Sequence, residues 1–171
     1  IFRATTHNKG IFNGIDAVVI ATGNDWRAIE AGGHAYATKD GKYSGLTEWT
    51  FDEEKYILKG SLTLPMPVAS VGGSIGLNPT VKAAFNILNN PDAKTLAGII
   101  VSVGLAQNFA ALKALVSTGI QKGHMKLQAR SLALFAGAEN EEVDIVVEKL
   151  LETNHINSEN AKNILKEIRN K

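Results

Sequence analysis

Residues 96–116 read LAGIIVSVGLAQNFAALKALV, an almost uninterrupted apolar stretch. Its length is close to that of a membrane-spanning helix, but the amides of Gln107 and Asn108 lie inside it, and such groups are costly in lipid. Asn90-Pro91-Asp92 precedes the stretch and is typical of a helix start. We therefore predict a long helix over 91–118 that is buried at the centre of a domain and does not cross a membrane.

Two helices are predicted at the start of the chain. Apolar side chains recur at helical spacing over 10–21, and Thr6 or Asn8 is placed to cap that helix. Thr22-Gly23-Asn24 then interrupts the pattern, and a second helix is predicted to start at Asp25. The buried side of the second helix is predicted to consist of Trp26, Ile29, Gly33 and Ala37.

The strand-like part of the chain follows these helices. Residues 46–51 and 55–64 are separated by the acidic Asp52-Glu53-Glu54, which predicts an antiparallel hairpin. Pro65 ends the second strand. Asn78-Pro79 then signals another helix, with proline at its first position.

The last part of the chain is predicted to hold three amphipathic helices, over 124–135, 143–151 and 161–168. The predicted fold class is α+β. Residues 1–119 form a mainly helical domain with a central long buried helix and a small antiparallel hairpin or sheet, and 120–171 form a C-terminal three-helix module.

Composition limits the possible functions. The 171 residues carry a formal net charge of +1 without a long run of like charges, which argues against nucleic-acid binding. Cysteine is absent, so a catalytic thiolate from the protein is excluded. A reducing compartment, the cytoplasm, fits best. No signal peptide is recognisable. Because the first ten residues resemble the interior of a domain, we expect the chain to be a piece of a longer protein.

Three polar stretches, 3–10, 21–25 and 119–125, each lie at a predicted helix end, where unpaired backbone N–H groups favour anions. Lys9 and Asn13 are four residues apart and share a helix face. Their ammonium and amide groups are suited to stabilising an oxyanion that forms on a substrate carbonyl. The structural alternative is a surface lysine beside an asparagine that packs between helices.

Other polar residues extend this hypothesis. Asp25 and Asp16 are both candidates for a carboxylate that keeps Lys9 charged. His124, near a predicted helix start, is a candidate proton donor, or else an exposed residue beside a cap. No metal-ligand spacing, dinucleotide fingerprint, nucleophile elbow or phosphate loop is recognisable, so no metal site is predicted.

Three blocks carry a resemblance to a known family. They are THNKGIFNGIDAV at 6–18, running into ATGND at 21–25, then VGLAQN at 103–108 and GIQKGHM at 119–125. Together they resemble the signature of the class II, bacterial-type hydroxymethylglutaryl-coenzyme A (HMG-CoA) reductases. The blocks occur in family order, and the resemblance extends over essentially the whole chain, as the C-terminal half of the family's catalytic domain.

The resemblance implies an NADPH- or NADH-dependent oxidoreductase that converts HMG-CoA to mevalonate and CoA in a two-step, four-electron reduction, or runs the reverse reaction. Lys9 matches the catalytic lysine, Asp25 the aspartate that tunes it, and His124 the histidine that protonates the departing CoA thiolate. The positions that match substrate-binding residues are Arg3, Asn13, Asn108, Ala111 and Leu115.

The resemblance also implies a quaternary arrangement. Active sites would form across a homodimer or higher homo-oligomer, with 1–119 as the C-terminal half of the large domain and 120–171 as a helical flap. Gln128 departs from the family pattern, because some relatives have a second histidine there. This departure bears on the details of proton delivery.

The family's catalytic glutamate and cofactor-binding domain have no counterpart in these 171 residues, so we expect that the chain alone does not turn over. The choice between NADH and NADPH and the physiological direction stay open. Two alternatives to the enzyme also stay open. One is a non-catalytic remnant that binds CoA esters or a partner protein, and the other is a structural helical subunit.

Overall fold

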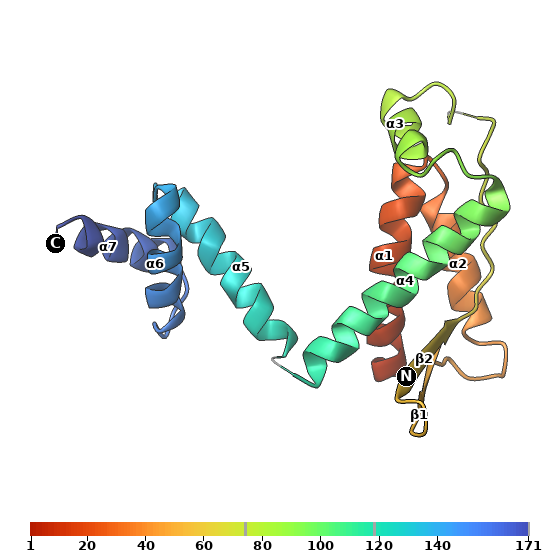
Figure 1. Ribbon diagram of the computed structural model, residues 1–171, viewed down its shortest axis with the longest axis horizontal. Coiled ribbons are helices and arrows are strands. Elements are labelled where there is room, and N and C mark those ends of the chain that lie inside the picture. Colours follow the sequence, from red (N-terminus) through yellow and green to blue (C-terminus); the bar gives the residue numbers. More distant parts are fainter. Residues whose placement is uncertain (74, 118, 171) are drawn as a thin grey trace. The chain divides into compact units, whose positions relative to one another are not determined.

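The computed structural model describes residues 1–73, 75–117 and 119–170 (Figure 1). The described residues form seven α-helices and one two-stranded antiparallel sheet, which confirms the predicted α+β, mainly helical class. The chain divides into two compact units, Ile1–Leu112 and Lys113–Lys171, and each unit has a hydrophobic core of its own.

The N-terminal unit combines helices with a single hairpin. Trp49 lies opposite Gly60 in the antiparallel register, which confirms the predicted hairpin. The Asn78 side chain caps α3 by accepting a hydrogen bond from the Thr80 N–H, with Pro79 at the first helical position, as predicted. The elements of this part of the chain are α1 (Phe2–Ala21), α2 (Trp26–Tyr36), β1 (Thr47–Asp52), β2 (Ile57–Leu62), α3 (Pro79–Ile87) and α4 (Ala93–Leu115).

Helix α1 begins eight residues before the predicted start at residue 10, so the prediction of Thr6 or Asn8 as its N-cap is wrong. Both residues lie inside the helix, and the Thr6 hydroxyl donates a hydrogen bond to the Phe2 carbonyl one turn earlier. The polar stretch at 3–10 therefore forms the first turns of α1 and does not precede the helix. Threonine, histidine and asparagine have weak helix propensity, and here the packing of their side chains outweighs it.

Helix α2 begins as the sequence predicts. The Asp25 carboxylate accepts hydrogen bonds from the backbone N–H groups of Arg27 and Ala28. Ile29, Gly33 and Ala37 are buried, but Trp26 is 40% exposed, so its predicted place on the buried side is wrong. Trp26 is the first residue of the helix, so no preceding turn of α2 lies beside its side chain.

Helix α4 crosses α1 at a point where each helix contributes a glycine (Figure 1). A Cβ atom on Gly104 would lie 2.8 Å from Cγ1 of Ile15, and one on Gly14 would lie 2.9 Å from Cβ of Gln107. Real Cβ atoms do not approach so closely, so the two glycines set the distance between the helices. Of the two glycines within α4, Gly104 thus permits the close approach of α1, whereas Gly98 faces open space.

Helix α4 is buried along one stripe and not all round. Leu96, Ile100, Gly104 and Asn108 follow one another at four-residue spacing and are its buried residues. Only 22% of its most apolar window is buried. By length and composition α4 is able to cross a membrane, but core helices pass the same test.

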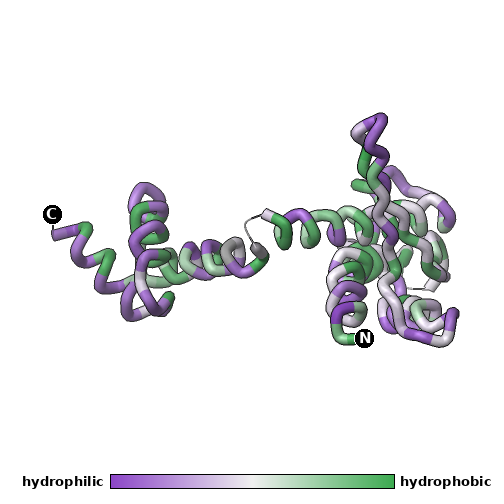
Figure 2. Tube along the Cα trace, turned by 90° about the horizontal axis from the view of Figure 1, so that it is seen from below, coloured by the Kyte–Doolittle hydropathy of each residue, from purple (hydrophilic) through white to green (hydrophobic). Residues whose placement is uncertain are grey.

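The C-terminal unit is a three-helix module, as predicted. Its helices are α5 (Ile120–Phe135), α6 (Asn140–Leu151) and α7 (Ser158–Arg169). Hydrophobic and hydrophilic residues alternate along α7, the last helix of the chain (Figure 2). The core of the module contains Ala129, Ala133, Val143, Val146, Val147, Leu150, Ala161, Ile164 and Leu165. Helix α5 begins four residues before the predicted start at 124.

An ion pair closes the C-terminal module at its surface. The Arg169 guanidinium donates to both carboxylate oxygens of Glu142 at 2.8 Å and to the Gly137 carbonyl at 3.0 Å. Glu142 also accepts from the backbone N–H of Glu139, which completes a capping box at the start of α6. The hydrogen bonds from Arg169 and Glu139 lower the pKa of Glu142 to about 2.

Replacing Glu142 by glutamine is expected to lower the melting temperature of the C-terminal module at pH 7. Because the folded-state pKa is depressed, this carboxylate stabilises the fold above pH 4.5 and the contribution is lost as the pH falls towards 2. Thermal unfolding followed by circular dichroism at pH 7 and pH 3 measures the change in melting temperature that Glu142→Gln causes. The matched control is Asp144→Asn, which breaks the more exposed Arg130–Asp144 pair and should change little. Equal losses for both variants would contradict the prediction.

Candidate active site

Lys9 and Asn13 lie one turn apart on α1, and both side chains are exposed. The predicted pairing of an ammonium with an amide on one helix face is therefore present. Arg3 is also exposed on α1, but it lies six residues before Lys9 and so about 120° around the helix from it. These side chains form an open polar surface on α1.

Asn8, the neighbour of Lys9, lies about 100° around the helix from it and is fully buried. Its amide Nδ2 donates to the Ser44 carbonyl at 2.8 Å, and its Oδ1 accepts from the Leu46 N–H at 2.9 Å. The side chain thus pairs with the backbone that leads into β1, much as a neighbouring strand would. Sequence reasoning missed this role. The spacing of Ile11 and Ile15, three and seven residues on, already placed Asn8 on the buried face.

Asn24 makes the same kind of contact beyond the other end of α1. Its Nδ2 donates to the Ala69 carbonyl at 3.1 Å, and its Oδ1 accepts from the Ala69 N–H at 2.8 Å. Thr22 is buried, and its hydroxyl donates to the Val18 carbonyl at 2.8 Å. Asn24 therefore holds the segment that follows β2 against the end of α1, while the Thr22 hydroxyl bonds to the last turn of that helix.

Asp25 serves first as the cap of α2. Besides the two backbone N–H groups, its carboxylate lies 3.5 Å from Nε of Arg27, in an exposed ion pair. The hydrogen bond from the Ala28 N–H, followed by that from Arg27, lowers the pKa of Asp25 below its usual value. The group is therefore an exposed carboxylate that stays ionised at neutral pH.

Lys9 and Asp25 do not meet within one chain. The ten residues of helix from Lys9 to Val19 rise about 15 Å. Asn24, next to Asp25, is fixed at the far end because its N–H donates to the Val19 carbonyl at 3.0 Å. A lysine and an aspartate side chain are too short to span that length.

Asp16, the other carboxylate considered from the sequence, lies on the same face as Lys9 but two turns away, about 10 Å along the helix axis. Its partner is Glu30 of α2. Burial, together with the charge and hydrogen bond of Glu30, raises the pKa of Asp16 to about 6. Its Oδ1 is buried, and no partner for this atom lies among the described residues. Asp16 is thus occupied with α2 and not with Lys9.

Replacing Asp16 by asparagine is expected to stabilise the protein at pH 7, because an ionised carboxylate beside Glu30 is unfavourable in the folded state. The folded protein binds this proton more tightly than the unfolded chain, so the contribution of Asp16 to stability falls as the pH rises from 3.8 through about 6. Since Asp16 is partly exposed, solvent screening limits the gain to about 1 kcal/mol.

Urea denaturation at pH 5 and pH 7 measures the effect of Asp16→Asn. The difference between variant and wild type should be larger at pH 7. The same difference at both pH values would contradict the prediction.

The three predicted residues of α4 have different surroundings. Asn108 is 2% exposed, and its Oδ1 accepts from Nε1 of Trp49 at 2.9 Å and from the Thr47 hydroxyl at 3.1 Å. In this chain its amide is engaged with the protein and does not present an open surface to a substrate. Ala111 is half-buried, and Leu115 is exposed.

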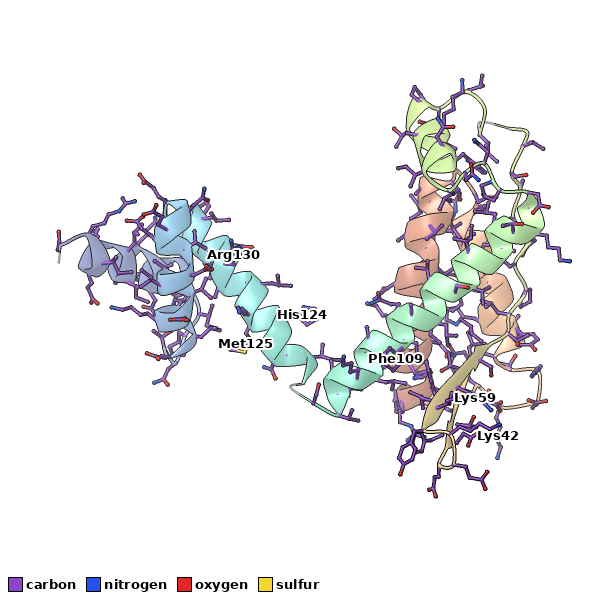
Figure 3. All side chains as sticks on the ribbon, viewed as in Figure 1. Lys42, Lys59, Phe109, His124, Met125 and Arg130 are labelled. Atoms are coloured by element: carbon purple, nitrogen blue, oxygen red, sulfur yellow. The ribbon has the colours of Figure 1, made fainter. Side chains whose placement is uncertain are left out.

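His124 is exposed on α5 (Figure 3). The helix begins at Ile120, so His124 lies in its second turn and not at the start that the sequence predicted. Gln128 follows one turn later and is also exposed. His124 belongs to the C-terminal unit and the α1 residues to the N-terminal unit.

Two cavities lie in the N-terminal unit, and neither is lined by the predicted site residues. One, of about 250 Å³, is polar and lies between residues 36–48 and 61–63. The other, of about 460 Å³, has Lys82 and Asp92 as its charged lining residues. Its lining consists of Ser70, Val71, Ile75, Gly76, Lys82, Phe85, Asn86, Asn90, Pro91 and Asp92.

Comparison with known proteins places these residues in a family. Residues 1–129 match the family model described as hydroxymethylglutaryl-coenzyme A reductase. The chain is 50% identical over 168 residues to 3-hydroxy-3-methylglutaryl-coenzyme A reductase of Archaeoglobus fulgidus, and the match covers 98% of this chain and 38% of that protein.

Solved structures agree with the family match. The chain is similar to the class II 3-hydroxy-3-methylglutaryl-CoA reductase from Streptococcus pneumoniae bound to NADPH, with 64% identity and a TM-score of 0.67 over 98% of this chain and 41% of that one. A second structure of the S. pneumoniae enzyme shows 64% identity and a TM-score of 0.68, with 98% and 40% covered.

The chain thus spans about two fifths of the length of these relatives. The match nevertheless runs through α1, the hairpin, α3 and α4 and into α5, and so includes Lys9, Asp25 and His124. On this evidence the chain belongs to the hydroxymethylglutaryl-coenzyme A reductase family.

Proposed function

We propose that the full-length gene product that carries this chain is an HMG-CoA reductase, which reduces HMG-CoA to mevalonate with NADPH or NADH or catalyses the reverse reaction. The observation that supports this most is the exposed face of α1, where Lys9 and Asn13 lie together on a helix held by side-chain hydrogen bonds of Asn8 near its start and of Asn24 beyond its end. Such a helix is rigid enough to present a cation to a substrate oxygen.

The chemistry assigns a task to each catalytic residue. Addition of hydride to the thioester carbonyl places negative charge on its oxygen, and the ammonium of Lys9 stabilises that charge. Asp25 keeps the lysine protonated. His124 gives a proton to the CoA thiolate as it leaves, and its imidazole is exposed on α5 and so accessible for that step.

The substrate is proposed to contact other exposed or half-exposed groups. Arg3 and Asn13 on α1 face the HMG carboxylate and the reacting oxygen, and Ala111 and Leu115 on α4 provide apolar surface. Asn108 is buried, and its Oδ1 accepts two hydrogen bonds from side chains of β1. We therefore assign it to positioning the hairpin against α4, in place of the direct substrate contact that the resemblance implied.

The separation of Lys9 and Asp25 supports a homodimer. Because about 15 Å of helix lies between these positions in one chain, Asp25 reaches a lysine only if that lysine belongs to another copy. Asp25 is exposed at the start of α2 and so is accessible to a second copy. We propose that each site combines Lys9 of one subunit with Asp25 of the other.

The nicotinamide cofactor supplies the hydride, but we assign no residue of this chain to it. The larger cavity has the volume of a small-molecule site. However, its charged lining residues are Lys82 and Asp92, one of each sign, so it offers no excess of positive charge to a diphosphate. This cavity therefore does not fit the diphosphate of a dinucleotide. We propose that the gene product acts in the cytoplasm, as expected for a chain without cysteine.

Mixing two inactive variants tests both the activity and the shared site. Lys9→Ala and Asp25→Ala subunits of the full-length gene product are each expected to be inactive. After denaturation and refolding together, half of the dimers are mixed, and each mixed dimer contains one intact site. Activity should therefore return to about a quarter of the wild-type value, measured as HMG-CoA-dependent oxidation of NADPH or NADH.

The outcomes separate the parts of the proposal. If wild type lacks activity but binds CoA esters in calorimetry, the protein is a non-catalytic binding module and the reductase proposal fails. If wild type is active and mixing restores nothing, Lys9 and Asp25 do not combine across subunits. Refolded wild type serves as the control for recovery.

A further inference from the structure

One hydrogen-bonded cluster in the N-terminal unit joins three elements that are distant in the sequence. His7 of α1, Thr47 and Trp49 of β1, and Asn108 of α4 form this group, which we call the His7 cluster. Nε2 of His7 lies 2.6 Å from the Thr47 hydroxyl. The Thr47 hydroxyl and Nε1 of Trp49 both lie within 3.1 Å of Oδ1 of Asn108. The cluster is independent of the contacts already assigned to Asn8 and Asn24.

The donors and acceptors of the His7 cluster fit one arrangement of protons. The Trp49 indole is a donor only, so the Asn108 atom that it contacts is the carbonyl oxygen. The Thr47 hydroxyl donates its single proton to the same oxygen at 3.1 Å. Its oxygen therefore accepts from His7, whose Nε2 must carry a hydrogen.

A second proton on the His7 ring has no acceptor in the cluster. The Asn108 amide Nδ2, itself a donor, lies 3.3 Å from Nε2 and 3.4 Å from Nδ1 of the ring. With the Nε2 hydrogen directed to Thr47, a proton on Nδ1 would have only this donor within hydrogen-bond distance in the cluster, which favours a neutral imidazole.

The charges around the ring agree with this. Thr47 and Trp49 from β1, Asn108 from α4 and Gly45 from the preceding loop are uncharged, and the positive Arg3 acts on the ring from its own helix. Burial, and then the charge of Arg3, lowers the pKa of His7.

We infer that His7 is a positioning residue whose neutral Nε2–H form locks α1 against β1 and α4 and thereby fixes the direction in which Lys9 is presented. The inference rests on the proposed function, because it assigns His7 a task in the use of Lys9. His7 and Lys9 are two residues apart, so the ring is on the inner side of the helix and the ammonium on the outer side. Protonation of His7 at low pH would release the lock.

Nuclear magnetic resonance on this chain tests the His7 cluster without reference to activity. Nitrogen-15 shifts should identify the Nε2–H tautomer of His7 at pH 7.5. The Trp49 indole proton should exchange slowly with water and lose this protection when His7 titrates. The indole of Trp26, which is 40% exposed, is the internal control and should exchange fast throughout. An Nδ1–H tautomer, or a Trp49 proton indifferent to the titration of His7, would overturn the inference.

Kinetics of the full-length gene product test the link to Lys9. His7→Ala removes the donor and should lower kcat on the order of tenfold with little change in KM. His7→Gln keeps an uncharged donor near the position of Nε2 and should retain most of the turnover. In the wild type, protonation of His7 should decrease kcat at acidic pH. His7→Gln should abolish this decrease, which is the acid limb of the kcat–pH profile.

If His7→Ala fails to fold, the comparison of His7→Gln with wild type still tests the positioning role of His7. An unchanged acid limb in His7→Gln refutes the positioning role. An inactive wild type refutes the proposed function instead, while the tautomer and the indole exchange still report on the cluster.

Discussion

Replacement of Lys9 by alanine is expected to reduce turnover of HMG-CoA by a hundred- to a thousandfold in the full-length gene product, or about 3–4 kcal/mol of transition-state stabilisation. The ammonium is the cation that α1 presents beside Asn13. Because the charge on the substrate oxygen grows during hydride transfer, the loss should appear in kcat more than in KM.

Structural controls separate chemistry from folding in this experiment. Lys9 is exposed, so Lys9→Ala should leave the melting temperature unchanged. Lys94→Ala removes an exposed lysine from α4 and should leave turnover unchanged. A Lys9→Ala enzyme that retains a tenth or more of its activity, or one that loses activity only because it unfolds, would contradict the proposed role.

Replacement of Phe12 by alanine is expected to cost about 3–5 kcal/mol of unfolding free energy. Phe12 is buried in the centre of the N-terminal core, and its ring lies 4.9 Å from that of His34. Its edge touches Gly33 so closely that a Cβ atom there would clash with the ring. Such a tight site cannot collapse readily to fill the space that the ring leaves.

Urea denaturation followed by tryptophan fluorescence measures this cost, because both tryptophans, Trp26 and Trp49, lie in the N-terminal unit. Ile20→Ala is the matched control on the same helix. Ile20 is 57% exposed, so its loss should cost less than about 1 kcal/mol. Similar costs for the two variants would show that Phe12 does not anchor the core.

The parts of the fold that the sequence predicts well are those with local signals. Asp25 and Asn78-Pro79 start helices because their side chains or ring geometry satisfy the first turn without help from distant residues. The hairpin is likewise defined by the acidic turn between its strands. These features depend on residues that are neighbours in the sequence, so they can be predicted from one sequence alone.

Features that depend on distant partners could not be predicted in the same way. The first turns of α1 are helical because Asn8 and His7 bond to residues near β1, some 36 to 40 positions later. No local sequence pattern around His7 or Asn8 indicates that they have such distant partners. The exposure of α4 is a similar case, since its composition predicts burial but cannot say how much of its surface this chain covers.

The candidate site shows the same division. Helical spacing alone puts Lys9 and Asn13 on one face, and the structure agrees. The resemblance implied that Lys9 pairs with Asp25. The length of α1 keeps these two side chains apart within a single chain. Spacing also placed Asp16 on the lysine's face, but only the position of α2 reveals that Glu30 is its partner.

Neighbouring positions on α1 should therefore fail in different ways inside a cell. Asn8 faces inward and holds the backbone near β1, whereas Lys9 faces outward. Loss of Asn8 would leave buried amide groups unpaired and send the polypeptide to quality-control proteases, so its abundance would drop. Loss of Lys9 would leave abundant protein that does no work. A survey that measured only cell growth would score variants of Asn8 and Lys9 alike. A measurement of protein abundance in the same cells would distinguish them.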